Sequence, residues 1–81
     1  FMNAASTETI ANTVKRMAQE ILGVTEMPTG SIREAFDSIN RLALMVEIED
    51  HFLIAFEPEE EDAIENFEDL VQCIALKLQK V

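Results

Sequence analysis

The sequence predicts an all-α protein, a small bundle of three main helices plus one short helix. Glycine and proline, which interrupt helices, occur in only two regions of the 81 residues: around Gly23, Pro28 and Gly30, and at Pro58. Elsewhere apolar residues recur with the spacing of one helical face, and an apolar fraction of 48% is enough to fill a core. The only run that resembles a strand has no second strand to pair with.

The first helix is predicted to begin at a cap formed by Ser6 or Thr7 and to end at Gly23. Its apolar residues follow the i, i+4, i+7 spacing of one helical face. They are Ile10, Val14, Met17, Ala18 and Ile21.

A loop is predicted from Val24 to Phe36, because Pro28 and Gly30 both disfavour helix there. The second helix is predicted from Ser38 to Phe52, and the Asp37 carboxylate can cap it by accepting from free backbone N–H groups of the first turn. Its apolar residues form two stripes: Leu42, Met45, Val46 and Phe52, and Leu44 and Ile48. We therefore expect this helix to be central and to contact several neighbours.

The remaining chain is predicted to contain a buried connection from Leu53 to Phe56, a short helix from Glu59 to Ile64, and a last helix capped by Asn66. The last helix has a single apolar stripe: Phe67, Leu70, Val71, Ile74 and Leu78. We expect one domain over residues 1–81. Phe1 precedes Met2 and is interpreted as a cloning remnant, so that residues 1–5 form a disordered tail.

The charge is strongly negative and unevenly distributed. Sixteen acidic residues against six Lys and Arg give a formal charge of -10, which disfavours nucleic acid and anionic membrane surfaces as partners. Eleven of the acids lie between Glu47 and Asp69, and no Lys or Arg occurs from Leu42 to Leu76. Two interpretations are open: a solvated surface that keeps a small protein soluble, or a surface that steers basic partners.

Cysteine usage and hydropathy favour a cytoplasmic protein, and we expect it to be a monomer. The single cysteine, Cys73, cannot form an internal disulfide, which is typical of a reducing compartment. No apolar run approaches 18 residues, and neither a membrane span nor a signal peptide is predicted.

Most residue patterns that carry chemistry are absent. A calcium loop needs a glycine at its sixth position, and no glycine follows Gly30, so no specific metal site is predicted. Weak association of divalent ions with the acids from Glu59 to Asp62 remains an alternative. Ser38 and His51 lack the G-x-S-x-G turn of a hydrolase, and Cys73 is interpreted as a half-buried apolar residue. We therefore predict no catalytic residues.

One junction does suggest a function. Asp37 caps the second helix, Ser38 stands at its exposed N-terminus, and an anion attached to Ser38 would meet the positive end of the helix dipole. From here the chain resembles the acyl carrier protein family. The resemblance rests on Asp37-Ser38-Ile39 opening a helix that closes with Glu49-Asp50-His51-Phe52, on Phe56-Glu57-Pro58, and on the last capped helix; it extends to Leu78 and includes the first helix.

The resemblance implies a carrier without turnover of its own. Ser38 would be the attachment site for 4'-phosphopantetheine, transferred from coenzyme A by a Mg²⁺-dependent phosphopantetheinyl transferase, and the terminal thiol would hold an acyl group as a thioester. Its partners would be loading, synthase or acyltransferase enzymes with basic docking patches. The residues expected to contact them are Asp37, Ile39, Asn40, Arg41 and Glu47. Those expected to line an acyl pocket are Leu42, Val46, Ile64 and Leu70.

Three departures from the common pattern suggest a specialised member of that family. The loop before Asp37 is short, the residue after the serine is Ile39 where leucine is usual, and Arg41 places a positive charge one turn from Ser38. The expected cargo is an intermediate of fatty-acid, polyketide or specialised lipid biosynthesis. The alternative is an acidic helical interaction module that carries no arm.

Overall fold

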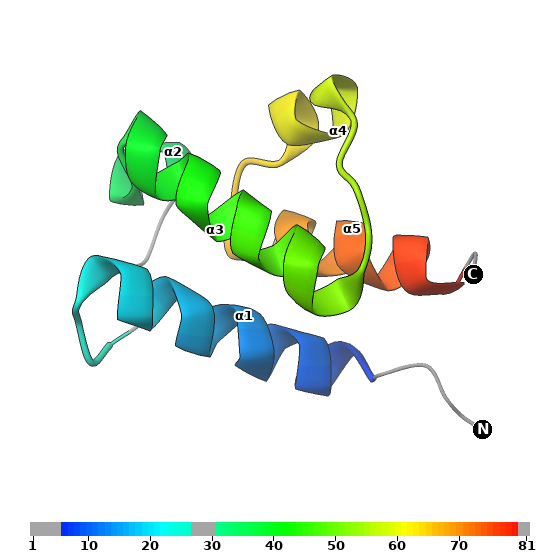
Figure 1. The fold of residues 1–81 in the computed structure, drawn as a ribbon, viewed down its shortest axis with the longest axis horizontal. Coiled ribbons are helices and arrows are strands. Elements are labelled where there is room, and N and C mark those ends of the chain that lie inside the picture. Colours follow the sequence, from blue (N-terminus) through cyan, green and yellow to red (C-terminus); the bar gives the residue numbers. More distant parts are fainter. Residues whose placement is uncertain (1–5, 27–30, 80–81) are drawn as a thin grey trace.

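Residues 6–26 and 31–79 are described by the computed structural model; they form five helices and no strand (Figure 1). The helices are α1 (Thr7–Leu22), α2 (Ile32–Ala35), α3 (Ser38–Phe52), α4 (Pro58–Ala63) and α5 (Phe67–Gln79). The predicted all-α bundle is confirmed, with the single turn α2 added to it. The expected tail over residues 1–5 lies outside the described residues. No helix in the described part of the chain is long and apolar enough to cross a membrane.

Both ends of α1 form as the sequence predicts. The Ser6 side chain accepts from the backbone N–H of Thr9 at 3.1 Å, which satisfies one of the free donors of the first turn. Gly23 ends the helix with a φ of 71°, a left-handed conformation that glycine adopts without steric cost. Four of the five residues of the predicted stripe are buried, and Ile21 is half-buried. The four are Ile10, Val14, Met17 and Ala18.

The segment predicted to be a loop from Val24 to Phe36 contains α2, so that prediction is wrong for residues 32–35. Ser31 caps this turn by accepting from the Glu34 N–H at 3.1 Å. Ile32 and Phe36, four residues apart, are both buried. Two apolar residues are too few to show a helical period in the sequence, and tertiary burial of both is what stabilises the turn.

The bounds of α3 are as predicted, and the helix contacts both α1 and α2, but it is apolar on more of its surface than these contacts bury. Leu44, Met45 and Ile48 are buried, whereas Leu42 and Val46 are exposed. The helix packs against α1 and α2 and buries the stripe of Leu44 and Ile48, whereas Leu42 and Val46 of the other stripe face outward. The wide apolar circumference of α3 therefore reflects an exposed apolar surface.

The chain between α3 and α5 contains no strand, as predicted, but in the connection from Leu53 to Phe56 only Phe56 is fully buried, and Leu53 is exposed. The short helix α4 begins at Pro58, a favourable first position because proline has no N–H to leave unsatisfied. At α5, the Asn66 side chain accepts from the Asp69 N–H at 2.8 Å, which confirms the predicted cap.

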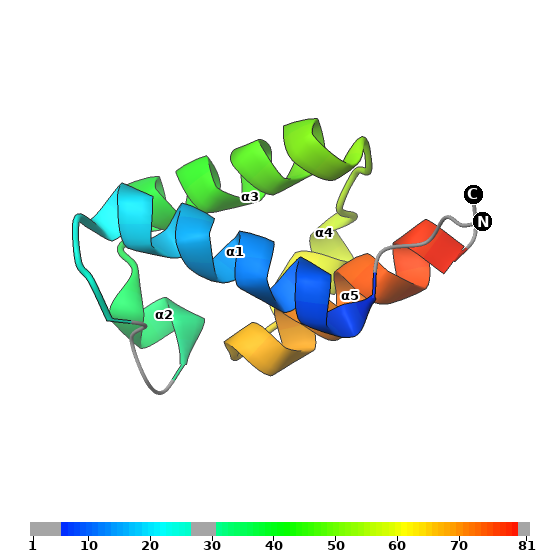
Figure 2. The ribbon, with the colours of Figure 1, turned by 90° about the horizontal axis from the view of Figure 1, so that it is seen from below.

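The core lies where α1 packs against both α3 and α5 (Figures 1 and 2). The helix α4 lies on the side of α3 and α5 away from α1 (Figure 1). The rings of Phe36 and Phe67 pack at 5.9 Å between centroids and 58° between planes, which joins the turn before α3 to the start of α5. This contact fixes the entry of α3 into the bundle.

Candidate functional site

Ser38 is the first residue of α3 and is exposed. Its hydroxyl makes no hydrogen bond with any described residue. The preceding Asp37 has extended backbone angles, and its carboxylate accepts from the Asn40 N–H at 2.8 Å. The predicted cap is thus confirmed, and it leaves the serine side chain free at the positive end of the helix.

The position of Ser38 is fixed by the turn before it. Phe36 is buried two residues earlier, and the Ile32 N–H donates to the Glu65 carbonyl at 2.7 Å. These contacts attach α2 to the connection between α4 and α5. Because α2 leads directly into Asp37, these contacts place the serine relative to the rest of the bundle.

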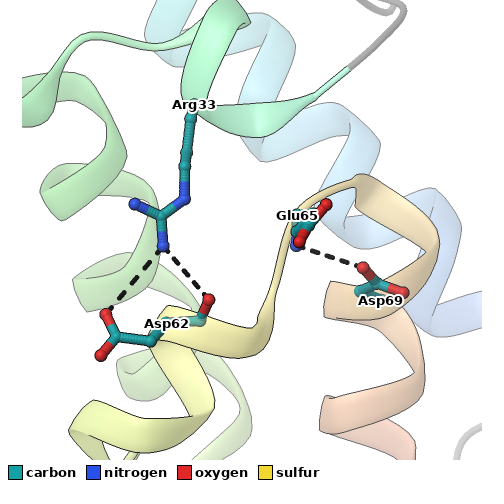
Figure 3. A network of polar contacts seen from close by, with 4 residues as sticks. All are labelled: Arg33, Asp62, Glu65 and Asp69. Carbon is teal, nitrogen blue, oxygen red and sulfur yellow. Dashed lines mark hydrogen bonds and ion pairs between the residues drawn. The ribbon is translucent and has the colours of Figure 1, made fainter.

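Polar contacts link α2 and α4, as Figure 3 shows. The Arg33 guanidinium donates to the backbone carbonyl of Asp62 at 3.2 Å and lies 4.0 Å from its carboxylate. A carbonyl in the last turn of a helix lacks an intrahelical partner, so the arginine satisfies a free acceptor and complements the negative end of the α4 dipole. In the same view, the Glu65 N–H donates to the Asp69 carboxylate at 3.1 Å.

The exposed side of α3 carries an apolar stripe that begins beside Ser38. We define the α3 stripe as Ile39, Leu42 and Val46, whose exposed fractions are 78%, 64% and 46%. Their spacing of three and four residues places them on one face. Leu53, just past the end of the helix, is also exposed. The α3 stripe is therefore an apolar strip on the outer face of the helix.

The residues predicted to contact partners all lie in or beside the first three turns of α3. Asp37 and Ile39 are exposed, while Asn40, Arg41 and Glu47 are half-buried. Arg41 forms no ion pair with any described residue. Asp37, Ile39, Asn40 and Arg41 thus lie within one turn of Ser38, whereas Glu47 lies more than two turns further along the helix. The partner role of all five residues stays a prediction.

The four residues predicted to line an acyl pocket do not lie in one place. Leu42 and Val46 belong to the exposed α3 stripe, whereas Ile64 and Leu70 are in the core. Ile64 also lines a shallow pocket of about 340 Å³ between α4 and α5, together with Cys73 and Leu76. Of the four predicted residues, Ile64 thus lines this pocket, and Leu70 is buried in the core, close in sequence to other lining residues of the pocket.

A second hollow was not foreseen from the sequence. A groove of about 370 Å³ runs between α1 and α5, with Ala11, Val14, Phe67 and Val71 among its lining residues. Its existence depends on how closely the two helices approach, which no local pattern reveals.

The acids around α4 serve partly to hold that helix in place. The Lys77 ammonium lies 2.7 Å from a Glu60 carboxylate oxygen, and the same oxygen accepts from the Glu57 N–H at 2.7 Å. The hydrogen bond to Glu60 raises the pKa of Lys77. Burial, together with the charge of Glu60, raises the pKa of the Cys73 thiol, so this cysteine is not an activated nucleophile.

The described residues contain no group of three or more His, Cys, Asp and Glu that could hold a metal ion. Ser38 and His51 lie near opposite ends of α3, about 20 Å apart at the rise of an α-helix, so the histidine cannot act as a base for the serine. What the arrangement offers is an exposed, unengaged hydroxyl at a helix N-terminus beside an apolar surface.

A family model described as a phosphopantetheine attachment site matches residues 12–74, from within α1 to within α5. No curated protein and no solved structure matches the chain significantly.

Proposed function

Because the chain belongs to the family of phosphopantetheine attachment domains, which act as carriers, we propose that Ser38 is its attachment residue. Three serines occur in the sequence. Ser6 lies outside the matched residues, and the Ser31 hydroxyl is engaged in capping α2. Ser38 lies inside the match, is exposed, and has an unengaged hydroxyl. The free hydroxyl of Ser38 is the observation that carries the assignment.

The surroundings of Ser38 fit a phosphate-linked group. The N-terminus of the fifteen-residue helix α3 favours an attached anion, and Arg41 adds a positive charge one turn further on. On attachment, the Ser38 oxygen bonds to the phosphorus of the pantetheine phosphate in coenzyme A, and the pyrophosphate P–O bond breaks. Adenosine 3',5'-bisphosphate leaves, and the hydroxyl proton passes to a base of the transferase.

The chain itself presents the arm to other enzymes. When bound, the phosphopantetheine group supplies a thiol that holds a carboxylic intermediate as a thioester. We expect the α3 stripe to dock on partners, with Asp37, Asn40 and Arg41 beside it and Glu47 facing a basic patch. In this proposal Leu42 and Val46 contact partners and do not line an acyl pocket. Their exposure supports this reassignment.

We further propose that the cargo is an acyl intermediate of fatty-acid, polyketide or specialised lipid biosynthesis in the cytoplasm. The resemblance to acyl carrier proteins supports this class of cargo, as do the apolar hollows beside α5. An interior pocket would be lined by Ile64 and Leu70.

The test is intact-mass analysis after incubation with coenzyme A and a broad-specificity phosphopantetheinyl transferase. The wild type and Ser31→Ala should each gain the mass of one phosphopantetheine group, and Ser38→Ala should gain none. Ser31→Ala is the matched control because it removes a hydroxyl only seven residues away.

Lack of a mass gain in the wild type, or an equal gain in Ser38→Ala, would contradict the proposal. Salt-sensitive binding to a basic protein without modification would instead favour the alternative of an acidic interaction module.

A further inference from the structure

Arg41 is a half-buried cation without an anionic partner among the described residues. Arg33 and Lys77 each lie beside a carboxylate, of Asp62 and Glu60 respectively. Asp37 stands four residues before Arg41, a spacing that permits an ion pair on a helix. The Asp37 carboxylate is instead engaged with the Asn40 N–H. A partly buried guanidinium without a carboxylate partner is suited to receive an anion.

The helix directs Arg41 toward Ser38. Residues three apart lie next to each other on a helix surface. Side chains on a helix also lean toward its N-terminus, so a long side chain covers the turn that precedes it. The Arg41 N–H donates to the Asp37 carbonyl at 2.9 Å, so regular helical geometry extends through Ser38 to Arg41. The Arg41 side chain is therefore placed to reach a group attached to the Ser38 oxygen.

An anion attached to Ser38 needs a compensating charge. The Asp37 carboxylate adjoins it in sequence, and the whole chain has a formal charge of -10. Arg41 is the only Lys or Arg in α3. An attached phosphodiester would be repelled by Asp37, and Arg41 is positioned to offset that repulsion.

We propose that Arg41 is a positioning residue for the arm: its guanidinium pairs with the phosphodiester attached to Ser38 and fixes the direction in which the arm leaves α3. This inference rests on the proposed attachment at Ser38. It assigns to Arg41 a role toward the chain's own prosthetic group, distinct from contact with partner enzymes.

The experiment compares the melting temperature of the modified and unmodified forms of four proteins: wild type, Arg41→Gln, Arg41→Lys and Arg16→Gln. Arg16 is an exposed residue of α1 without an ion pair to described residues, so its replacement removes the same charge from another helix. The modified-minus-unmodified difference in Arg41→Gln should fall below that of the wild type by about 2–4 °C at low salt. Arg41→Lys should recover part of the difference, and Arg16→Gln should match the wild type.

A second measurement needs no variant. The Arg41 Nε–H signal in ¹H–¹⁵N NMR spectra of the wild type should shift on modification, while the Arg16 signal should not. The shift should shrink as salt is added.

The possible outcomes separate the two proposals. A mass gain at Ser38 with an unmoved Arg41 signal, or with equal temperature differences in wild type and Arg41→Gln, overturns the pairing and leaves the attachment site intact. No mass gain overturns both. If the Arg41 signal moves only when a partner enzyme is added, Arg41 meets a carboxylate of that enzyme and the pairing is wrong.

Discussion

Leu53 combines two unfavourable features in one residue. It is the only described non-glycine residue with a positive φ, 58°, and its side chain is 85% exposed. A left-handed backbone costs a residue with a Cβ about 1–2 kcal/mol, and an exposed side chain returns little of this through packing. Strain at an exposed apolar residue beside the α3 stripe is consistent with a role in contact.

Replacing Leu53 by glycine should therefore stabilise the protein. We expect Leu53→Gly to raise the free energy of unfolding by about 0.5–1 kcal/mol, because the relief of strain exceeds the added entropy of the unfolded chain. Urea denaturation measures this change.

The matched control is Leu76→Gly, since Leu76 is also exposed but lies inside α5. That change should lower stability by about 0.8 kcal/mol, through the lower helix propensity of glycine. Destabilisation of Leu53→Gly by as much as Leu76→Gly would show that φ at residue 53 imposes no strain.

At the scale of an element, α3 divides its apolar residues between the core and the surface. Leu44 is fully buried, and Leu42, two residues earlier, is 64% exposed. Two residues on one helix thus have the same side chain and similar helical surroundings but opposite burial. We therefore expect Leu44 to contribute much more than Leu42 to the free energy of unfolding, because only Leu44 is removed from water.

Leu44→Ala should lower the free energy of unfolding by about 2–5 kcal/mol, and Leu42→Ala should change it by less than about 0.5 kcal/mol. Chemical denaturation of both variants tests the division. Leu42→Ala should, however, lower the rate at which the transferase modifies Ser38, if the α3 stripe is a docking surface. Equal losses of stability in the two variants would place Leu42 inside the core.

At the scale of the whole molecule, α4 contributes no buried residue and depends on contacts with α2 and α5. Arg33 and Lys77, the two basic residues that hold it, come from helices on either side of the acidic stretch in the sequence. Part of the acidic sequence is thereby used to hold the fold together.

The ion pair between Lys77 and Glu60 makes the stability of the fold depend on pH in the alkaline range. The folded pKa of Lys77 is raised above its ordinary value of 10.5. The pair therefore stabilises the fold fully below that value, and this contribution is lost as the pH rises through the raised pKa. Lys77→Met should lower the melting temperature near pH 8, and its difference from the reference protein should shrink above pH 10.5.

The reference protein is the Cys73→Ala variant, and Lys77→Met is made in the same background. Titration of the Cys73 thiol then does not contribute to the pH dependence of the melting temperature. The control is Lys15→Met, because Lys15 is exposed and makes no ion pair with described residues. A Lys77→Met difference that stays constant to pH 12, which lies roughly 1.5 units above the ordinary lysine pKa, would contradict the assignment.

The sequence by itself determined those helices that have regularly spaced apolar residues and an N-capping side chain before them. Ser6, Asp37 and Asn66 each lie before a run of regularly spaced apolar residues, and all three act as N-caps. Capping is local chemistry between residues three apart, so it can be read from the chain. The same locality placed Ser38 at the first position of α3, because the start of that helix follows from the cap at Asp37. The proposed role of Ser38 rests on the family resemblance.

Only the tertiary structure decided which apolar residues are buried. Leu42 and Leu44 belong to equally convincing stripes, and the choice between them depends on where α1 and α2 pack against α3. The turn α2 forms because Ile32 and Phe36 are buried in the core. The backbone carbonyl of Glu65, which is distant in sequence, also accepts a hydrogen bond from the Ile32 N–H. Periodicity fixes which residues share a face, but it does not fix which face meets a neighbour, because burial arises from contacts between segments distant in sequence.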